Sequence, residues 1–302
     1  MTDALVVRNL NKSYATGFFG RKKAVLEDVN FSVPQASITG FVGVNGSGKT
    51  TTIKCLLRFI FPDTRPSSAI EFFGRADFPI ETQKRIAYLP ERPYLPEHLS
   101  AAEFLSLHWK LGHGKKDPLA FRQACESVLT RVNLPGVEKT RLRGFSKGML
   151  QRIGLAQALL HSPDFLILDE PMSGLDPDGR RLVKNIILEE HKRGATIFFS
   201  SHLLADMDEL CTHLVVIDQR KVHFSGPVEN FTHVESVNSV ITYIQNNERL
   251  QLFIEKAKVQ DKISEILGNK GQIIRVVPVE TSIENVFTQR KWLDEKSMET
   301  KS

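Results

Sequence analysis

The chain has 302 residues, 41% of them hydrophobic and 25% charged, a composition typical of a globular protein with a substantial core. Its formal net charge of +5 is mild for this length, so composition gives little support to nucleic-acid binding. No apolar run reaches the roughly 18 residues that would span a bilayer, and the first four residues lack the pattern of a secretory signal. We therefore expect any role at a membrane to depend on a partner protein.

The three cysteines, Cys55, Cys125 and Cys211, lie far apart in the sequence and form no C-x-x-C pair. This spacing is typical of buried apolar residues in a reducing compartment, and not of a metal site or a disulfide framework. We therefore expect three free thiols in the interior.

The first 90 residues alternate strand-like runs with turns. Strands are predicted at residues 5–7, 29–33 and 37–42, because these runs are apolar and β-branched or alternate with a period of two. A helix is predicted to follow Lys49, since apolar residues recur through residues 52–57.

A helical region is predicted from about residue 97 to residue 160. Ser100 and Glu103 form a capping-box pair ahead of an apolar run. Further along, one face of a helix is marked by Phe121, Cys125, Val128, Leu129 and Val132. We assign a helical subdomain to about residues 92–160.

Strands resume at residues 165–168, 196–199 and 213–217, and a helical pattern at residues 179–192 separates the first two. Strands that alternate with helices favour a parallel sheet with crossover helices. The predicted fold class is therefore α/β, with a parallel or mixed sheet.

A change in composition near residues 230–238 indicates a domain boundary. Beyond it the patterns predict three strands at 239–244, 250–254 and 273–279, an amphipathic helix at 259–267, and a last helix capped by Thr281 and Glu284. We expect a main domain at residues 1–232 and a small α/β accessory domain at residues 235–302, whose polar end, 291–302, is frayed.

Residues 43–50 read GVNGSGKT and match the phosphate-loop pattern G-x-x-x-x-G-K-[ST] between a predicted strand and a predicted helix. Glycines let backbone N–H groups close around phosphate oxygens, and the helix N-terminus adds its dipole. Lys49 is expected to reach the β- and γ-phosphates of ATP, and the Thr50 hydroxyl to ligate Mg²⁺. The predicted nucleotide contacts are Gly43, Asn45, Gly46, Ser47, Gly48, Lys49, Thr50 and Thr51. The core is thus predicted to be that of a P-loop NTPase.

Two carboxylates, Asp169 and Glu170, end the buried strand that begins at Phe165. The carboxyl ends of parallel strands are where such sheets bind ligands. We expect Asp169 to hold Mg²⁺ and Glu170 to face the attacking water as general base.

After these acids comes PMSGLDP at residues 171–177, and His202 follows the next strand. Residues 145–152 read FSKGMLQR. In motif and in order, residues 3–230 resemble the nucleotide-binding subunit of ATP-binding-cassette (ABC) transporters, whose signature motif corresponds to 145–149. The C-terminal part, with SIENVF at residues 282–287, resembles the extension of one exporter-rich subgroup, whose cassettes pair with a separate membrane permease.

The resemblance implies roles for five further residues. Tyr14 lies where the family stacks an aromatic ring on adenine, an interaction that suits any π-face. His202 matches the switch histidine that contacts the γ-phosphate and the attacking water. Ser146 and Gly148 match signature residues that contact ATP held by the opposite protomer, and Asp176 matches the turn that crosses the same interface. The implied working unit is a dimer that encloses two ATP molecules.

Two departures from the family pattern stand out. The signature has Lys147 and Met149 where Gly and Gln are usual, and we expect Met149 to open a helix aimed at phosphate. Glu91 replaces the usual Gln, and as a carboxylate it can join Thr50 and Asp169 as a ligand of Mg²⁺.

The resemblance implies an ATPase subunit of an ABC transporter, an exporter by subgroup, which we expect its permease to hold at the cytoplasmic face of the membrane. Residues 92–99 are expected to line the groove that receives the permease. One alternative is a soluble member of the superfamily that acts on nucleic acid or the ribosome, which a single phosphate loop and the lack of heptads disfavour. The other is a regulatory cassette, which the presence of Glu170 and His202 disfavours.

Overall fold

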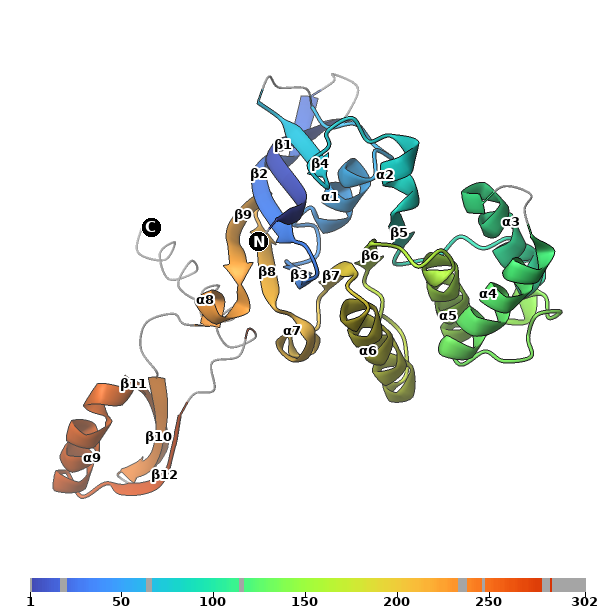
Figure 1. The fold of residues 1–302 in the computed structure, drawn as a ribbon. Helices are drawn as coiled ribbons and strands as arrows, with labels where there is room; N and C mark the ends of the chain where they lie inside the picture. Colours follow the sequence, from blue (N-terminus) through green and yellow to red (C-terminus); the bar gives the residue numbers. More distant parts are fainter. Residues whose placement is uncertain are drawn as a thin grey trace. The chain divides into compact units, whose positions relative to one another are not determined.

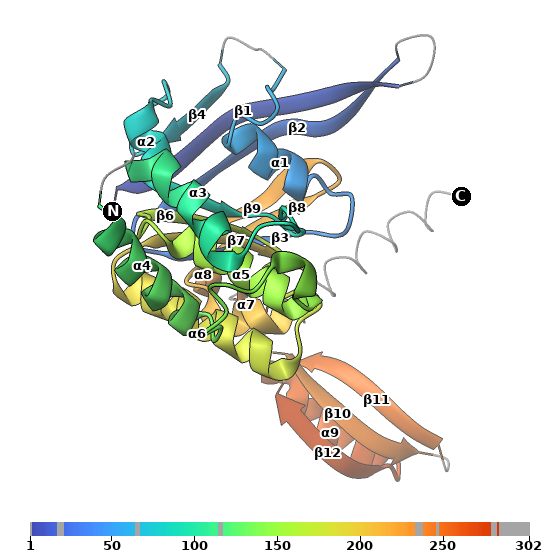
Figure 2. The ribbon, with the colours of Figure 1, turned by 90° about the vertical axis from the view of Figure 1, so that its right-hand side faces the viewer.

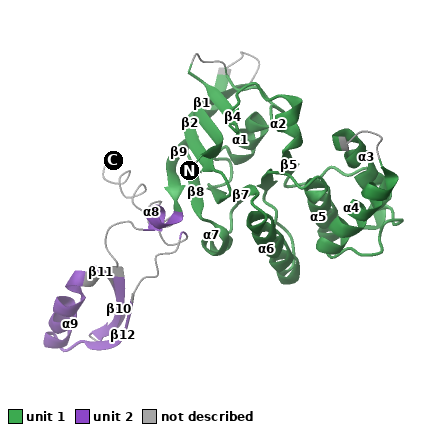
Figure 3. Ribbon diagram, in the orientation of Figure 1, with its two compact units in different colours: residues 1–227 green, residues 228–302 purple. Residues whose placement is uncertain are grey.

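The computed structural model describes residues 2–16, 21–63, 67–113, 117–232, 238–245, 248–278 and 283. The chain forms two compact units, residues 1–227 and residues 228–302 (Figures 1 and 3). Their division into separately folding domains at 1–232 and 235–302 stays a prediction.

A six-stranded sheet is the centre of the first unit, with strand order β5-β6-β7-β3-β8-β9. All neighbouring pairs are parallel except β8 and β9, so the sheet is mixed. The strands are β3 (Ile38–Val42), β5 (Ile86–Leu89), β6 (Phe165–Asp169), β7 (Thr196–Ser201), β8 (His213–Asp218) and β9 (Lys221–Pro227). The predicted class, α/β with a parallel or mixed sheet, is confirmed.

The three central strands, β3, β6 and β7, are buried along their whole length. They read as apolar runs because parallel strands are covered on both faces. Phe31, Phe41 and Phe198 stack at centroid distances of 5.1 to 5.8 Å within this core. The packed core thus fixes the carboxyl ends of β3 and β6, where the predicted motifs begin.

A second, antiparallel sheet in the same unit has the order β2-β1-β4. It consists of β1 (Asp3–Thr16), β2 (Arg21–Pro34) and β4 (Ala69–Phe72). Figure 2 shows β1 and β2 running side by side, and register shifts interrupt their pairing. The sequence predicted only residues 5–7 and 29–33 of these strands, because Asn9 and Asp28 adopt positive φ at the irregularities and break the alternation.

Four α-helices among the described residues of the first unit lie in the sequence outside the segment between β5 and β6. They are α1 (Lys49–Leu56), α2 (Ile80–Lys84), α6 (Pro177–Lys192) and α7 (Leu204–Leu210). β6, α6 and β7 follow one another in the chain, which confirms the predicted strand–helix–strand order. The crossover through α6 lets β6 and β7 pair in parallel.

A helical group comprises α3 (Ala101–His113), α4 (Pro118–Arg131), the short η1 (Leu142–Gly144) and α5 (Lys147–Leu159), to the right of the sheet in Figure 1. The capping box is confirmed, since the Ser100 N–H donates to Glu103 Oε2 at 2.7 Å. α5 begins at Lys147, so the expectation that Met149 opens this helix was wrong by two residues. The reason is local: Ser146 caps the helix by accepting the Met149 N–H at 3.3 Å.

The second unit contains an antiparallel sheet of order β11-β10-β12. Its elements are α8 (Val228–Thr232), β10 (Asn238–Gln245), β11 (Glu248–Glu255), η2 (Lys256–Lys258), α9 (Val259–Gly268) and β12 (Gln272–Pro278). Ile266 of α9 is buried, as the amphipathic pattern predicts. Thr281, Glu284 and the predicted frayed end at 291–302 lie outside the described residues.

Two further sequence-based expectations concern cysteines and membrane spans. Cys55 and Cys125 are buried, and burial raises the pKa of each thiol to about 11, whereas Cys211 is only partly buried as a residue. All three are free thiols. Within the described part of the chain, no helix has the length and apolar character needed to cross a membrane.

Candidate active site

The phosphate-loop sequence forms the connection from β3 to α1. Gly46 and Gly48 have φ values of 83° and 113°, a region that side chains other than glycine rarely adopt. A Cβ on Gly48 would also lie 2.5 Å from the Leu26 side chain. The local fold therefore requires glycine at position 48, and α1 starts directly after it.

Lys49 is buried at the first position of α1. Its Nζ donates to the Gly43 carbonyl at 2.6 Å and to the Val44 carbonyl at 3.4 Å. Burial lowers the pKa of Lys49, and the charges of nearby Glu170 and Asp169 oppose that shift. A cation in this position suits a ligand that carries negative charge.

Asp169 is buried at the end of β6. It accepts hydrogen bonds from Ser200 Oγ at 2.6 Å and from Thr50 Oγ1 at 3.2 Å. Burial raises the pKa of Asp169, the two hydroxyls oppose that shift, and the neighbouring acid Glu170 adds to it. The carboxylate is thus held in place but poorly compensated electrostatically.

Glu170 follows in a left-handed conformation, with φ of 50°, and is nearly buried. Its Oε2 accepts a hydrogen bond from Nδ1 of His202 at 2.6 Å. Its own backbone N–H donates to Ser200 Oγ at 2.9 Å. The structure therefore joins the acidic strand end to the histidine that follows β7.

Ser200 is a site residue that the sequence analysis missed. Its hydroxyl links Asp169 to the backbone of Glu170, at the carboxyl end of the strand beside β6. The available signal was a polar residue ending an apolar strand, directly before the Ser201-His202 pair.

A pocket of about 300 Å³ brings most of the predicted residues together. It is lined by Val25, Asn45, Gly46, Gly48, Lys49, Thr50, Thr51, Glu91, Asp169 and Glu170. Val25 was not predicted, since nothing in its sequence context distinguishes it from a core strand residue. The pocket joins a cation, three acids and the glycine loop in one cavity.

Other predicted residues lie beside this pocket or apart from it. Gly43 and Ser47 belong to the loop without lining the cavity, and the buried Ser47 hydroxyl has no hydrogen-bond partner in the described part of the chain. Tyr14 is 41% exposed and does not line the pocket, and Lys12 Nζ lies 5.3 Å from its ring centroid.

Ser146, Gly148 and Asp176 form a separate group that does not line the pocket. Ser146 caps α5, and Asp176 caps α6 by accepting the Gly179 N–H at 2.9 Å. A Cβ on Gly148 would lie 3.7 Å from Leu175, so the two helix starts are neighbours. Within one chain, therefore, none of these three residues faces the pocket that holds the phosphate loop.

The predicted Mg²⁺ ligands, Thr50, Asp169 and Glu91, all line the pocket. They offer oxygen atoms only, which suits Mg²⁺. Among the described residues no group of three His, Cys, Asp or Glu side chains has the arrangement of a self-sufficient metal site. The donor set fits Mg²⁺ nonetheless, because this ion usually takes one or two carboxylates and completes its shell with phosphate oxygens and water.

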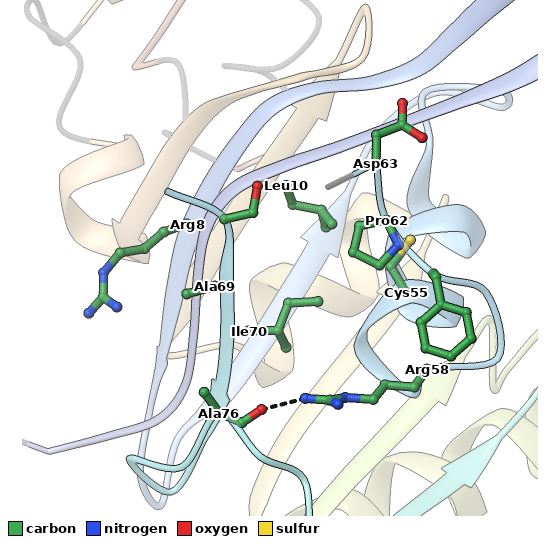
Figure 4. A pocket seen from close by; sticks show the side chains of 11 residues that line it. Arg8, Leu10, Cys55, Arg58, Pro62, Asp63, Ala69, Ile70 and Ala76 are labelled. Atoms are coloured by element: carbon green, nitrogen blue, oxygen red, sulfur yellow. Dashed lines mark hydrogen bonds between the residues drawn. The ribbon is translucent and has the colours of Figure 1, made fainter. Parts of the chain in front are cut away.

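A second pocket, of about 320 Å³, lies between β1, β4 and the end of α1 (Figure 4). Its two arginines already have partners: Arg8 pairs with Glu71 at 2.6 Å, and Arg58 donates to the Ala76 carbonyl. Cys55 lies at its wall but is fully buried. Nothing in this pocket points to a ligand.

Comparisons with known proteins agree with the geometry. The family model described as ABC transporter matches residues 26–173. An uncharacterised ABC transporter ATP-binding protein of Nostoc sp. is 37% identical over 243 residues, which are 78% of this chain and 71% of the relative. The bacitracin transport ATP-binding protein BcrA of Bacillus licheniformis is 34% identical, over 91% of this chain and 94% of its own.

Two further similarities extend this pattern. The lantibiotic transport ATP-binding protein SrtF of Streptococcus pyogenes is 33% identical over 77% of this chain and 95% of its own. A solved ATP-binding subunit of an ABC transporter is 30% identical with a TM-score of 0.66, covering 76% of this chain and 91% of that one.

Proposed function

The chain belongs to the ATP-binding proteins of ABC transporters, and we propose that two copies enclose Mg²⁺-ATP and power export through a separate membrane permease. Its activity is ATP hydrolysis coupled to transport. We propose which residues perform the hydrolysis and which of them hold the metal. We also propose the partner and the direction of transport.

ATP binding rests on the loop that joins β3 to α1. The backbone N–H groups of this loop and the N-terminus of α1 cradle the phosphates. Lys49 supplies the positive charge, and its lowered pKa is restored when phosphate charge arrives beside it. The buried Ser47 hydroxyl supports this assignment, because among the described residues it has no partner, and such a group is costly unless a ligand satisfies it.

Thr50, Asp169 and Glu91 are the residues that we propose to hold Mg²⁺. When bound, the ion neutralises charge on the phosphate oxygens. Asp169 supports this role through its burial and its raised pKa, since a nearby cation relieves the cost of a buried carboxylate.

Glu170 is the proposed general base, and its 2.6 Å hydrogen bond with His202 is the observation that carries the assignment. The bond fixes the carboxylate at the edge of the pocket, where it takes the proton of the attacking water. With Nδ1 donating to Glu170, the other ring nitrogen of His202 stays available for the γ-phosphate or the water. Lys49 and the loop N–H groups stabilise the charge that develops on the transferring group.

The test replaces Glu170 with Gln, which keeps the shape of the side chain but removes the base. We expect steady-state ATP hydrolysis to fall by about 100-fold or more, which is within the contribution expected of a general base. Binding of a fluorescent ATP analogue should stay within about threefold of the wild-type value, because no phosphate contact is lost. Glu126→Gln, an exposed change on α4, is the matched control.

Retention of hydrolysis within a few-fold of wild type in the Glu170→Gln protein would contradict the assignment. Equal loss of binding and hydrolysis would also contradict it, since the residue would then be a ligand of ATP.

The proposed dimer follows from the residues that one pocket leaves unused. Ser146, Gly148 and Asp176 gather at two helix starts but do not line the pocket of their own chain. A second copy brings such a surface to the ATP held by the first. Tyr14 is proposed to stack on the adenine ring, which its 41% exposure permits.

The proposed permease site is the groove between the edge of the large sheet and the helical group. It has a volume of about 690 Å³ and includes Pro90, Tyr88 and the exposed side chains of Ile80 and Leu111. Residues 92–99, which the sequence analysis placed there, follow Pro90 but do not themselves line this cavity. Tyr94 lies four residues after Pro90 in the sequence and is 97% exposed, which suits a docking residue.

Export is proposed from the relatives named for bacitracin and lantibiotic transport, and the subunit is proposed to work at the cytoplasmic face through its permease.

A further inference from the structure

Lys147 lies at the start of α5, next to the proposed ATP contact Ser146, and its side chain has a defined course. A Cβ built on Gly174 would lie 2.5 Å from Lys147 Nζ and 3.0 Å from Lys147 Cε. The lysine therefore occupies the space that any side chain at position 174 would take. Two positions distant in the sequence are complementary, one with a long side chain and one with none.

Gly174 belongs to the turn that connects Glu170 to α6. Its φ of 70° is in the left-handed region, where glycine is the favoured residue. The turn continues through Leu175 to Asp176, which caps α6. Lys147 thus lies over the one residue of this turn that lacks a side chain to fix its position.

Two other contacts join the same pair of segments. The buried Gln151 side chain donates to the Pro171 carbonyl at 3.4 Å. Gly148 lies against Leu175, which is itself buried. The first turns of α5 and the turn at 171–176 therefore form one packed surface, with Lys147 at its exposed side.

Lys147 is exposed, and among the residues that the structure describes it forms no ion pair. The end of the Lys147 side chain, Nζ and Cε, lies over the turn, and an exposed lysine in such a contact contributes little to folding stability. The contact therefore matters chiefly for where it holds the turn.

We infer that Lys147 is a positioning residue of the two-copy ATP site, because its side chain holds the turn at 173–176 against the start of α5. Ser146 and Asp176 then meet the partner's ATP in one fixed arrangement. This inference rests on the proposed dimer. It gives a role to the lysine that departs from the usual glycine of the signature motif.

The experiment measures ATP hydrolysis, ATP binding and melting temperature for the full chain carrying Lys147→Ala. We expect kcat to fall roughly 10- to 100-fold, the loss that a small misplacement of reacting groups produces. Binding of a fluorescent ATP analogue to the separate chain should change by less than about twofold, because the chain's own pocket is untouched. Lys147→Arg restores length and charge and should keep kcat within about threefold of wild type.

Lys110→Ala, at an exposed lysine of α3, is the matched control for the loss of one charge. A Gly174→Ala chain removes the contact, since its new methyl group displaces Lys147, and it also strains the turn at this positive φ. If the two residues act through one contact, the Lys147→Ala and Gly174→Ala losses in kcat are not additive in the double variant. Additive losses would overturn the inference.

Ser146→Arg separates this inference from the proposed dimer. It should abolish hydrolysis by blocking the partner's ATP. If it does so while Lys147→Ala leaves kcat within twofold of wild type, the dimer stands and the inference is wrong. If Ser146→Arg leaves hydrolysis unchanged, the two-copy site is wrong and the inference falls with it. If Lys147→Ala lowers both the melting temperature and the affinity for ATP, Lys147 has a merely structural role and the inference is wrong.

Discussion

Asp169 is a buried carboxylate that two hydroxyls hold in place, and its charge costs the nucleotide-free protein free energy. Burial raises the pKa of Asp169 in the folded chain above its value in the unfolded chain. The folded state therefore binds more protons between those two pKa values, and its stability falls as the pH rises through that window. Above the window the cost remains, because the group is ionised in both states.

The corresponding prediction is that Asp169→Asn stabilises the nucleotide-free chain. At pH 7 we expect the melting temperature to rise by about 2–4 °C, which corresponds to about 1 kcal/mol in a chain of this size. The gain should shrink as the pH is lowered through the raised pKa of Asp169, because the wild-type carboxyl then takes up a proton and loses its charge. Thermal denaturation across this pH range, with Glu126→Gln as control, measures it.

Mg²⁺-ATP should reverse the order of stability in the same measurement. A ligand that binds only the folded state raises its stability, and the variant lacks a proposed metal ligand. Addition of Mg²⁺-ATP should thus raise the melting temperature of the wild type more than that of Asp169→Asn. Two results would contradict this account of Asp169. In one, Asp169→Asn melts at a lower temperature than wild type without nucleotide. In the other, Mg²⁺-ATP raises the melting temperature of both proteins equally.

The residue scale also separates what the sequence could predict from what it could not. Gly48 was predictable, because the phosphate-loop pattern names its position, whereas Gly46, which also has positive φ, lies at a variable position of the pattern. Ser200 was not predictable, since its role depends on β6 and β7 lying side by side. Pairing between distant strands is a tertiary fact that a local pattern does not contain.

At the scale of elements, local capping chemistry explains both a success and an error. Ser100 and Glu103 predicted the start of α3 because both partners of the capping box are visible in sequence. The start of α5 was misplaced, because Ser146 was assigned to a ligand and not also to the helix cap. The residues between α4 and α5 contain only η1, so the predicted helical region is discontinuous.

The loop after β5 carries a prediction at this scale. Changing Tyr94 and Leu95 to Asp together should abolish association with membranes of the source organism, because charge replaces apolar docking contacts. Basal ATP hydrolysis of the separate chain should stay within about twofold of wild type, since neither residue lines the nucleotide pocket. Sedimentation of the chain with membrane vesicles measures the association.

Leu95 is half-buried, so Tyr94→Asp alone serves as the second variant that preserves folding. Leu119→Asp, at a 65% exposed leucine of α4, is the control for a new surface charge. Membrane association that survives both Tyr94 variants would remove this loop from the docking surface.

At the scale of the whole molecule, the alternation of strands and helices predicted the α/β class but not the order of the strands. β3 lies between β7 and β8, although many residues separate it from both in sequence. This order places the phosphate loop beside β7, which carries Ser200 near its end, and one strand away from β6, which ends in Asp169. The proposed chemistry depends on that adjacency, which no single motif encodes.

The central claim is that each ATP is bound by the loop of one copy and by Ser146 of the other. A Lys49→Ala chain has a damaged loop but an intact Ser146, and a Ser146→Arg chain has the reverse. In a mixed dimer the two lesions fall on the same site, so the other site has neither.

The most direct measurement is therefore the ATP hydrolysis rate of an equal mixture of the two inactive chains. The account predicts recovery of roughly one quarter of the wild-type rate, because random pairing makes half of the dimers mixed and each has one intact site of two. A mixture whose rate equals the average of the two separate variants, under conditions where subunits exchange, would contradict the two-copy site.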